Sequence, residues 1–315
     1  MRSEPEISET MSAGIQIAAE LAGCVSPASV VRPDEPLARH TTLRVGGPAD
    51  VYVEPASEDD LAAAIKFCRD RALPFYVIGR GSNLLVRDGG FRGVICCLAD
   101  PVFGRIEAAG ERLRCGAGAR LKNVAVEAKR NNLSGLEFLE GIPGSVGGAL
   151  RMNAGAMGAA TLDVVEAARL MDFNGYVRDW ARSELAAEYR SCSTLKDRIA
   201  LAAVFRGRPD SAESIAQRMS AFSQKRWSSQ PAAPSAGCLF KNPATVPAGR
   251  LIDELGLKGL RVGGAMVSLE HGNFIVNDGS ATARDILDLI ERLRQSAREE
   301  RGIELQTEVE ILGVD

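Results

Sequence analysis

The order of apolar and polar positions predicts a chain of alternating helices and strands. Ser57 begins a helix as its N-cap, an acidic residue stands at the third helical position, and Leu61 and Ile65 fall on one face. The apolar run at residues 74–78 predicts a buried strand that leads directly into a glycine-rich loop. We therefore expect residues 34–99 to form a first α/β unit.

Two further units are expected beyond this one. In residues 100–208, strands alternate with one amphipathic helix at residues 121–132. Residues 209–302 contain a predicted helix at 212–227 and a last helix that Thr282 caps, again with an acidic residue at the third position. The pattern thus predicts three packed units in one chain.

The two ends of the chain have different expected roles. Residues 1–33 are polar and rich in small residues, so we expect a loosely held extension. They include acidic residues and lack a long apolar stretch, so they do not resemble a secretory signal. At the other end, charged residues alternate with apolar ones, and we expect residues 303–315 to supply a strand to the second unit.

Length and composition fit a globular protein of the cytoplasm. The 315 residues suffice for two or three packed units, and 25% charged and 45% hydrophobic residues are ordinary for a folded chain. Lys and Arg total 38 against 41 Asp and Glu, so the net charge of −3 supplies no positive field for nucleic acid. Because the apolar runs are shorter than a bilayer span, we expect no membrane partner.

The cysteines and histidines limit the chemistry. Seven cysteines form no C-x-x-C pair and no metal-ligand spacing, which favours reduced thiols and no bound metal. Only His40 and His271 are present, so a polyhistidine metal centre is excluded and any histidine triad must use one of them. Proton transfer is therefore expected to depend on other residue types.

Glycine-rich loops carry the clearest chemical signal. Residues 79–84 follow a strand and read G-x-G-x-x-L, which lacks the third glycine of a dinucleotide fingerprint and also fits a simple turn. A longer glycine tract at 141–148, followed by residues 153–158, supplies a second wall. Because glycine lets backbone N–H groups approach a phosphate closely, the two tracts together predict a large nucleotide cofactor with a diphosphate.

Ordered tracts at residues 41–49, 77–93, 135–158 and 259–277 carry a family resemblance. With sequences such as VIGRGSNLLVRDGGFRG and GLEFLEGIPGSVGGALRMNAGAMG, the chain resembles the UDP-N-acetylenolpyruvoylglucosamine reductase family, also called UDP-N-acetylmuramate dehydrogenases, over about residues 35–315. The resemblance implies an α+β flavoprotein of bacterial peptidoglycan synthesis with a vanillyl-alcohol-oxidase type FAD-binding fold. The first two units would be its FAD-binding subdomains, and the third would bind substrate.

The resemblance also implies the reaction. NADPH reduces FAD, hydride passes from flavin N5 to the enolpyruvyl group of UDP-N-acetylglucosamine enolpyruvate, and UDP-N-acetylmuramate results. Arg190 and Glu308 match the family residues that stabilise the charge developing on the enolpyruvyl carboxylate. Without the motif, a surface ion pair and an outward-facing strand position describe these two residues equally well.

Cys238 stands where most relatives have the serine that protonates the substrate carbon. A thiol, with a reference pKa of about 8.5, is a stronger acid than a hydroxyl, so proton donation is chemically reasonable. A thiolate beside Lys241 would lack that proton, and an inert buried thiol is the alternative. The spacing of Arg190 and Cys238 resembles the shorter subclass of the family, which lacks an inserted tyrosine-bearing loop.

The other site residues follow from the resemblance alone. Lys241, Asn242, Tyr189 and His271 would lie at the substrate, although a structural histidine fits position 271 as well. Arg226 would reach an FAD phosphate. The expected FAD-binding residues are Arg44, Gly79, Arg80, Gly81, Ser82, Asn83, Leu84, Gly141, Ile142, Pro143, Gly144, Ser145, Gly147, Gly148, Asn153, Gly155 and Arg226.

Two other functions stay open at this point. An FAD-dependent oxidase of the same fold often tethers its flavin through a histidine in the first glycine loop, and residues 79–86 contain none. A catalytically degenerate flavin- or UDP-sugar-binding protein would fit the change to Cys238, but retention of Arg190, Glu308 and Lys241 argues against it. The sequence leaves the oligomeric state open, and we favour a monomer.

Overall fold

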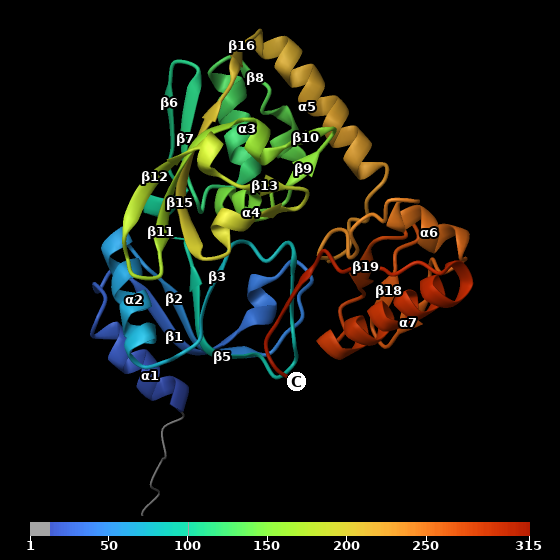
Figure 1. Cartoon of the computed structure of the whole chain (residues 1–315), viewed down its shortest axis with the longest axis horizontal. Helices are drawn as coiled ribbons and strands as arrows, with labels where there is room; N and C mark the ends of the chain where they lie inside the picture. Colours follow the sequence, from blue (N-terminus) through green and yellow to red (C-terminus); the bar gives the residue numbers. More distant parts are fainter. Residues whose placement is uncertain (1–12, 100) are drawn as a thin grey trace, which may run out of the picture.

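The first unit is a sheet with two helices at its side, and the computed structural model describes residues 13–99 and 101–315 of the chain (Figure 1). Its elements are α1 (Ala13–Ala22), β1 (Val30–Pro36), β2 (Pro48–Glu54), α2 (Glu58–Asp70), β3 (Phe75–Ile78), β4 (Leu84–Val86) and β5 (Phe91–Cys97). The sheet order is β1-β2-β5-β3, with only the β1–β2 pair antiparallel. The Ser57 hydroxyl accepts the Asp60 N–H, which confirms the predicted start of α2.

The expectation of a loosely held extension is wrong for residues 13–33. α1 packs on β1 and β2, and β1 pairs with β2 from Val30 to Pro36. Leu21 of α1 is fully buried. A helix this short is marginal by itself, so tertiary packing stabilises it and its order could not be read from local pattern. Residues 1–12 of that expectation lie outside the described residues.

The second unit is a five-stranded antiparallel sheet covered by helices. Its strands are β6 (Ile106–Ala109), β7 (Arg112–Gly116), β11 (Val165–Asp172), β12 (Val177–Ala181) and β15 (Arg198–Arg206), in the order β12-β11-β15-β7-β6. Helices α3 (Leu121–Arg130) and α4 (Val146–Arg151) belong to it, with the hairpin of β13 (Ala187–Glu188) and β14 (Ser191–Cys192). α3 begins at the predicted residue and ends slightly earlier than expected.

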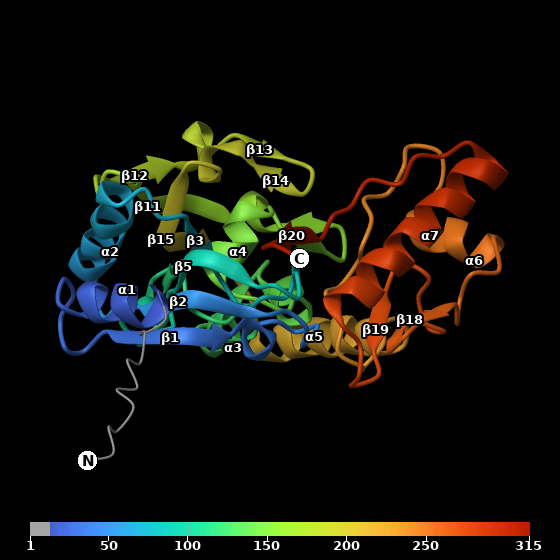
Figure 2. The same cartoon turned by 90° about the horizontal axis from the view of Figure 1, so that it is seen from below.

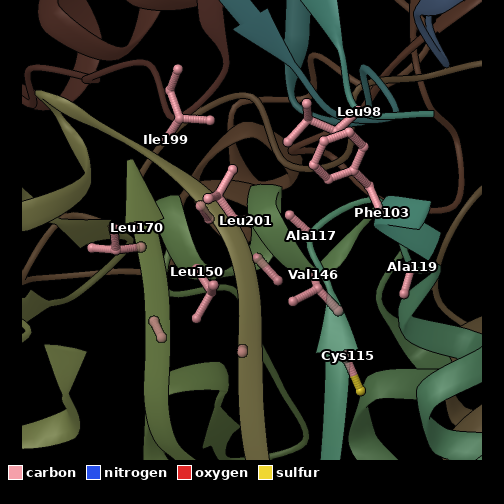
Figure 3. Close-up of a cluster of buried hydrophobic side chains, with 14 of the residues drawn as sticks. Leu98, Phe103, Cys115, Ala117, Ala119, Val146, Leu150, Leu170, Ile199 and Leu201 are labelled. Carbon is pink, nitrogen blue, oxygen red and sulfur yellow. The ribbon is translucent and has the colours of Figure 1, made fainter. Parts of the chain in front are cut away.

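The first two units share one hydrophobic core. Figure 3 shows part of it, where Leu98 and Phe103 from the connecting segment lie near Ala117 and Leu201 of the second unit. The same cluster includes Val51 of β2. Because close-packed cores resist relative movement, this shared cluster fixes the two units against each other.

The third unit has a separate core and lies beside the other two in both views (Figures 1 and 2). Its elements are α6 (Ala248–Glu254), β17 (Arg261–Val262), β18 (Ala265–Val267), β19 (Ile275–Asn277) and α7 (Ala283–Arg301). Thr282 and Asp285 form the capping box predicted for α7. Of the helices that are described, none combines the length and apolar character needed to cross a membrane.

The connection into the third unit differs from the expected division at residue 209. The helix predicted at 212–227 forms with those bounds as α5 (Ala212–Trp227), but it packs on α3 and on the short helix η3 (Glu137–Gly141) of the second unit. The buried core of the third unit begins at Ala236 and takes in Leu43 and Leu85 of the first unit. The helix therefore belongs physically with the second unit.

The C-terminal strand pairs with a different unit from the one expected. β20 (Glu310–Leu312) pairs in parallel with β4 of the first unit, and not with the sheet of the second unit. One contact with the second unit remains, an ion pair of 3.0 Å between Arg151 and Glu310. The alternating pattern identified a strand, which forms only over the half-buried residues Glu310–Leu312, but it contains no information about the partner strand.

Candidate active site

Glu308 lies where the three units meet. Its backbone carbonyl accepts a hydrogen bond of 3.1 Å from the Asn83 side chain of the first unit. Its N–H donates to the carbonyl of Leu239 in the third unit at 2.7 Å. Its carboxylate Oε1 lies 2.8 Å from Nε of Arg190 in the second unit. Glu308 thus contacts residues from all three units, among them the predicted site residues Asn83 and Arg190.

Arg190 is held in an unusual backbone conformation beside the pair. It lies in the turn between β13 and β14 with φ +57°, a left-handed conformation that few residues other than glycine adopt. A Cβ on Gly155 would lie 3.2 Å from Nη1 of Arg190, so the glycine leaves room for the guanidinium. The Asn153 side chain donates to the carbonyl of Glu188 and ties the same hairpin to the glycine tract. Tyr189 is 58% exposed, with its ring 5.0 Å from the Arg190 guanidinium carbon.

Burial controls the protonation of the cluster. It raises the pKa of the Glu308 carboxyl, and the charges of Arg190 and Lys241 oppose that rise. Burial and the nearby Glu308 carboxylate raise the pKa of the Cys238 thiol to about 11, against smaller opposing effects of Arg190 and Asn273. Cys238 therefore lies within electrostatic reach of the Arg190–Glu308 pair and carries its proton at neutral pH.

The two glycine tracts face each other. The first connects β3 to β4, and the second connects η3 to α4. The Ser82 hydroxyl donates to the carbonyl of Pro143 at 2.8 Å. A Cβ on Gly79 would lie 2.7 Å from Oγ of Ser145 and 4.0 Å from Cα of Gly148, so glycine at position 79 lets the tracts meet without displacing the Ser145 side chain. The fold therefore joins the tracts that the sequence separates.

The region between the tracts fits a phosphate-bearing cofactor such as FAD. A Cβ on Gly141 would meet no atom within 4 Å, and one on Gly148 would meet only Oγ of Ser145, at 3.7 Å. Among the described residues, the backbone N–H groups of residues 81–83 donate no hydrogen bond. Nε of Arg226 is buried without a partner there, while Nη1 of the same side chain donates to the carbonyl of Gly141. Open glycine surfaces and unused donors together suit a phosphate.

Three predicted site residues have local structural partners. Nδ1 of His271 accepts the Asn273 N–H at 3.1 Å, and burial together with the charge of Lys258 lowers the pKa of the imidazole. The side-chain oxygen of Asn242 accepts the first N–H of α6 at 3.0 Å. Arg44 is exposed and has φ +58°. Partners within the protein therefore fix one atom each of His271 and Asn242, and their roles at the substrate and that of Arg44 at the cofactor stay predictions.

Asn273 is a site residue that the sequence reasoning missed. It is 2% exposed, and its side chain forms hydrogen bonds with both the N–H and the carbonyl of Phe240, at 2.9 and 2.8 Å. A hydrogen bond from its side chain also lowers the pKa of the Cys238 thiol, against the larger effect of burial. Asn273 therefore fixes the segment that carries Cys238. The signal in the sequence was the polar cluster around His271, to which Asn273 belongs.

Comparisons with known proteins agree with this arrangement. A sequence model of an FAD binding domain matches residues 49–180, and a model of the UDP-N-acetylenolpyruvoylglucosamine reductase C-terminal domain matches residues 230–312. Proteins named UDP-N-acetylenolpyruvoylglucosamine reductase from Syntrophus aciditrophicus and Geobacter metallireducens are 43% and 45% identical, covering 94% and 89% of this chain and 96% and 93% of their own.

A solved structure gives the same result. The UDP-N-acetylenolpyruvylglucosamine reductase of Thermus caldophilus superposes with a TM-score of 0.78 at 39% identity, over 90% of this chain and 99% of its own. With the domain matches, this structure confirms the predicted fold class, an α+β FAD-binding fold joined to a separate α+β domain. The FAD binding predicted from the glycine tracts is confirmed at the level of the domain.

We expect Gly148→Val to weaken FAD binding at least about tenfold while leaving the fold intact. The new side chain has open space in the protein but projects into the region between the tracts, where the cofactor needs close backbone approach. FAD retention on dialysis, read from flavin absorbance, measures the effect. Gly104→Val is the matched control, because a Cβ there meets no atom within 4 Å and Gly104 lies outside both tracts. Equal FAD retention in the two variants would remove Gly148 from the cofactor site.

Proposed function

The chain belongs to the UDP-N-acetylenolpyruvoylglucosamine reductase family, and we propose that it uses NADPH and bound FAD to convert UDP-N-acetylglucosamine enolpyruvate to UDP-N-acetylmuramate. The reaction belongs to peptidoglycan synthesis, and we place it in the cytoplasm. The observation that carries the proposal is the cluster of Arg190, Glu308 and Cys238 at the meeting point of the three units. FAD, when bound, supplies the hydride transfer.

Glycine surfaces, backbone donors and Arg226 would hold the cofactor. The open sides of Gly141 and Gly148 give it space, and the N–H groups of residues 81–83 are available for its phosphates. The orphaned Nε of Arg226 gives a further donor on the α5 side of the second tract. Placed there, the cofactor would lie between the tracts, and Asn83, which bonds to Glu308, links the first tract to the catalytic cluster.

Arg190 and Glu308 would stabilise the negative charge that develops on the enolpyruvyl carboxylate. The guanidinium is 25% exposed, so it stays accessible to an anionic group while the ion pair orients it. The Glu308 carboxylate holds the guanidinium in place, and burial raises the pKa of this carboxyl against the opposing charges of Arg190 and Lys241, so that it can take up a proton and donate a hydrogen bond once negative charge develops beside it. A preorganised pair of this kind does not have to rearrange during the reaction.

Hydride adds to one carbon of the enolpyruvyl double bond, and Cys238 would protonate the other carbon. Its pKa of about 11 keeps the thiol protonated at neutral pH, and Asn273 fixes the segment that carries it. The charge of Lys241 lowers the pKa of Glu308 but is not among the charges that shift the pKa of Cys238. The alternative of a Cys238 thiolate stabilised by Lys241 is therefore not favoured. Lys241, Tyr189, the amide nitrogen of Asn242 and Nε2 of His271 are proposed to contact the substrate, because the Oδ1 of Asn242 and the Nδ1 of His271 already accept backbone N–H groups.

We expect anaerobic NADPH to bleach the flavin of the wild-type protein and UDP-N-acetylglucosamine enolpyruvate to restore its absorbance. In Cys238→Ala, bleaching should stay near the wild-type rate, whereas recovery should slow by about 100-fold or more, because the proton donor acts only in the second half-reaction. Cys238→Ser is the matched variant and should retain turnover. Stopped-flow absorbance at the flavin band measures both steps.

Several outcomes would contradict the proposal. Flavin that bleaches but does not recover in the wild-type protein indicates another acceptor or an oxidase. Equal loss of both half-reactions in Cys238→Ala removes the assigned role of the thiol. Absence of turnover in both the wild-type protein and Cys238→Ser indicates a binding protein.

The pH profile tests the protonation of Cys238 separately. Because the thiol keeps its proton up to a pKa of about 11, flavin recovery should show no loss due to Cys238 between about pH 7 and 9. Single-turnover recovery is measured across this range in the wild-type protein and in Cys238→Ser. A falling limb centred at about 8.5, present only in the wild-type protein, would show instead an unshifted thiol.

A further inference from the structure

Two arginines lie on either side of the contact between the glycine tracts. Arg80 directly follows Gly79 in the first tract. Arg120 precedes α3 and forms an isolated antiparallel bridge with Ser145 of the second tract. A Cβ on Gly79 would lie 2.7 Å from Oγ of Ser145, and Arg120 pairs with the same serine. The backbones of Arg80 and Arg120 therefore both lie at the contact between the two tracts.

Their charges are not neutralised by the protein. Partial burial and the charge of Arg120 lower the pKa of the Arg80 guanidinium, and no carboxylate acts on it. In the described ranges, neither side chain forms an ion pair. Arg151, Arg169 and Arg190, by contrast, are each paired with a glutamate. Two neighbouring guanidinium groups without a counter-ion repel each other, and a bound anion would remove that repulsion.

We propose that Arg80 and Arg120 bind the diphosphate of FAD, with Arg120 as a phosphate-binding residue that neither glycine tract contains. A guanidinium donates in a planar fork that matches phosphate oxygens, and the adjoining tracts bring their backbone close to the same group. The assignment rests on the FAD binding in the proposed function. It adds side-chain charge to a site that the glycine motifs define only through the backbone.

The position of the pair favours the diphosphate of FAD over that of the UDP-sugar. Arg190 acts on both Glu308 and Cys238 and Lys241 acts on Glu308, whereas neither Arg80 nor Arg120 is among the charges that act on these two residues. The arginine pair is therefore electrostatically separate from the cluster that faces the enolpyruvyl group.

The FAD dissociation constant of the holoenzyme tests the assignment by equilibrium dialysis. Arg80→Ala and Arg120→Ala should each raise it about tenfold, because each removes a charge-assisted hydrogen bond, and the double variant should raise it further. Arg120→Lys, which keeps the charge without the fork, should fall between Arg120→Ala and the wild type. Arg114→Ala is the control and should stay within about twofold of the wild type, because Arg114 is exposed on β7, on the side opposite buried Leu113 and Cys115.

The KM of UDP-N-acetylglucosamine enolpyruvate at saturating FAD separates the two sources of diphosphate. It should be unchanged in Arg120→Ala. A raised KM with an unchanged FAD dissociation constant would assign the arginines to the substrate and overturn the proposal, as would no change in either quantity. A wild-type protein that retains no FAD would contradict the proposed function itself, which makes the two failures distinguishable.

Discussion

The return of the C-terminal segment to the first unit is the constraint on which the site depends. Glu308 can reach Asn83, Arg190 and Leu239 only because β20 pairs with β4 immediately after it. The carboxylate is 13% exposed, so its charge is compensated mainly by Arg190. Removing one partner of such a pair costs about 3–5 kcal/mol, because the other charge stays buried. Assembly of the three units and formation of the catalytic cluster are therefore one structural event.

A second constraint is the close approach of the two glycine tracts. The missing Cβ of Gly79 leaves room for the Ser145 side chain at this contact, and the shared core of the first and second units holds the contact in place. The third unit contributes Cys238 through a segment that Asn273 fixes to Phe240. The first two units are fixed to each other and the third joins them at Glu308, so the proposed site would have its hydride carrier, its anion-stabilising pair and its proton donor in one place.

Local sequence signals predicted local structure well. Ser57 and Thr282 marked the starts of α2 and α7 because capping is a contact between neighbouring residues. The glycine tracts and the resemblance indicated the cofactor domain, and the domain matches confirm it. The partner of β20 and the order of α1 depend on contacts between distant residues, so periodicity could not supply them. Asn273 and Arg120 were missed for the same reason, since their surroundings exist only in the folded chain.

The most direct test of the role of Glu308 is single-turnover flavin recovery in Glu308→Gln, with Glu304→Gln as control, because Glu304 is exposed in the same C-terminal segment. The amide keeps the size of the side chain but removes its ability to ionise and to act as a carboxylic acid. We expect NADPH to bleach the flavin at close to the wild-type rate and UDP-N-acetylglucosamine enolpyruvate to restore it about 100-fold more slowly than in the control. Recovery at the wild-type rate would contradict the claim that the reaction is carried out where the three units meet.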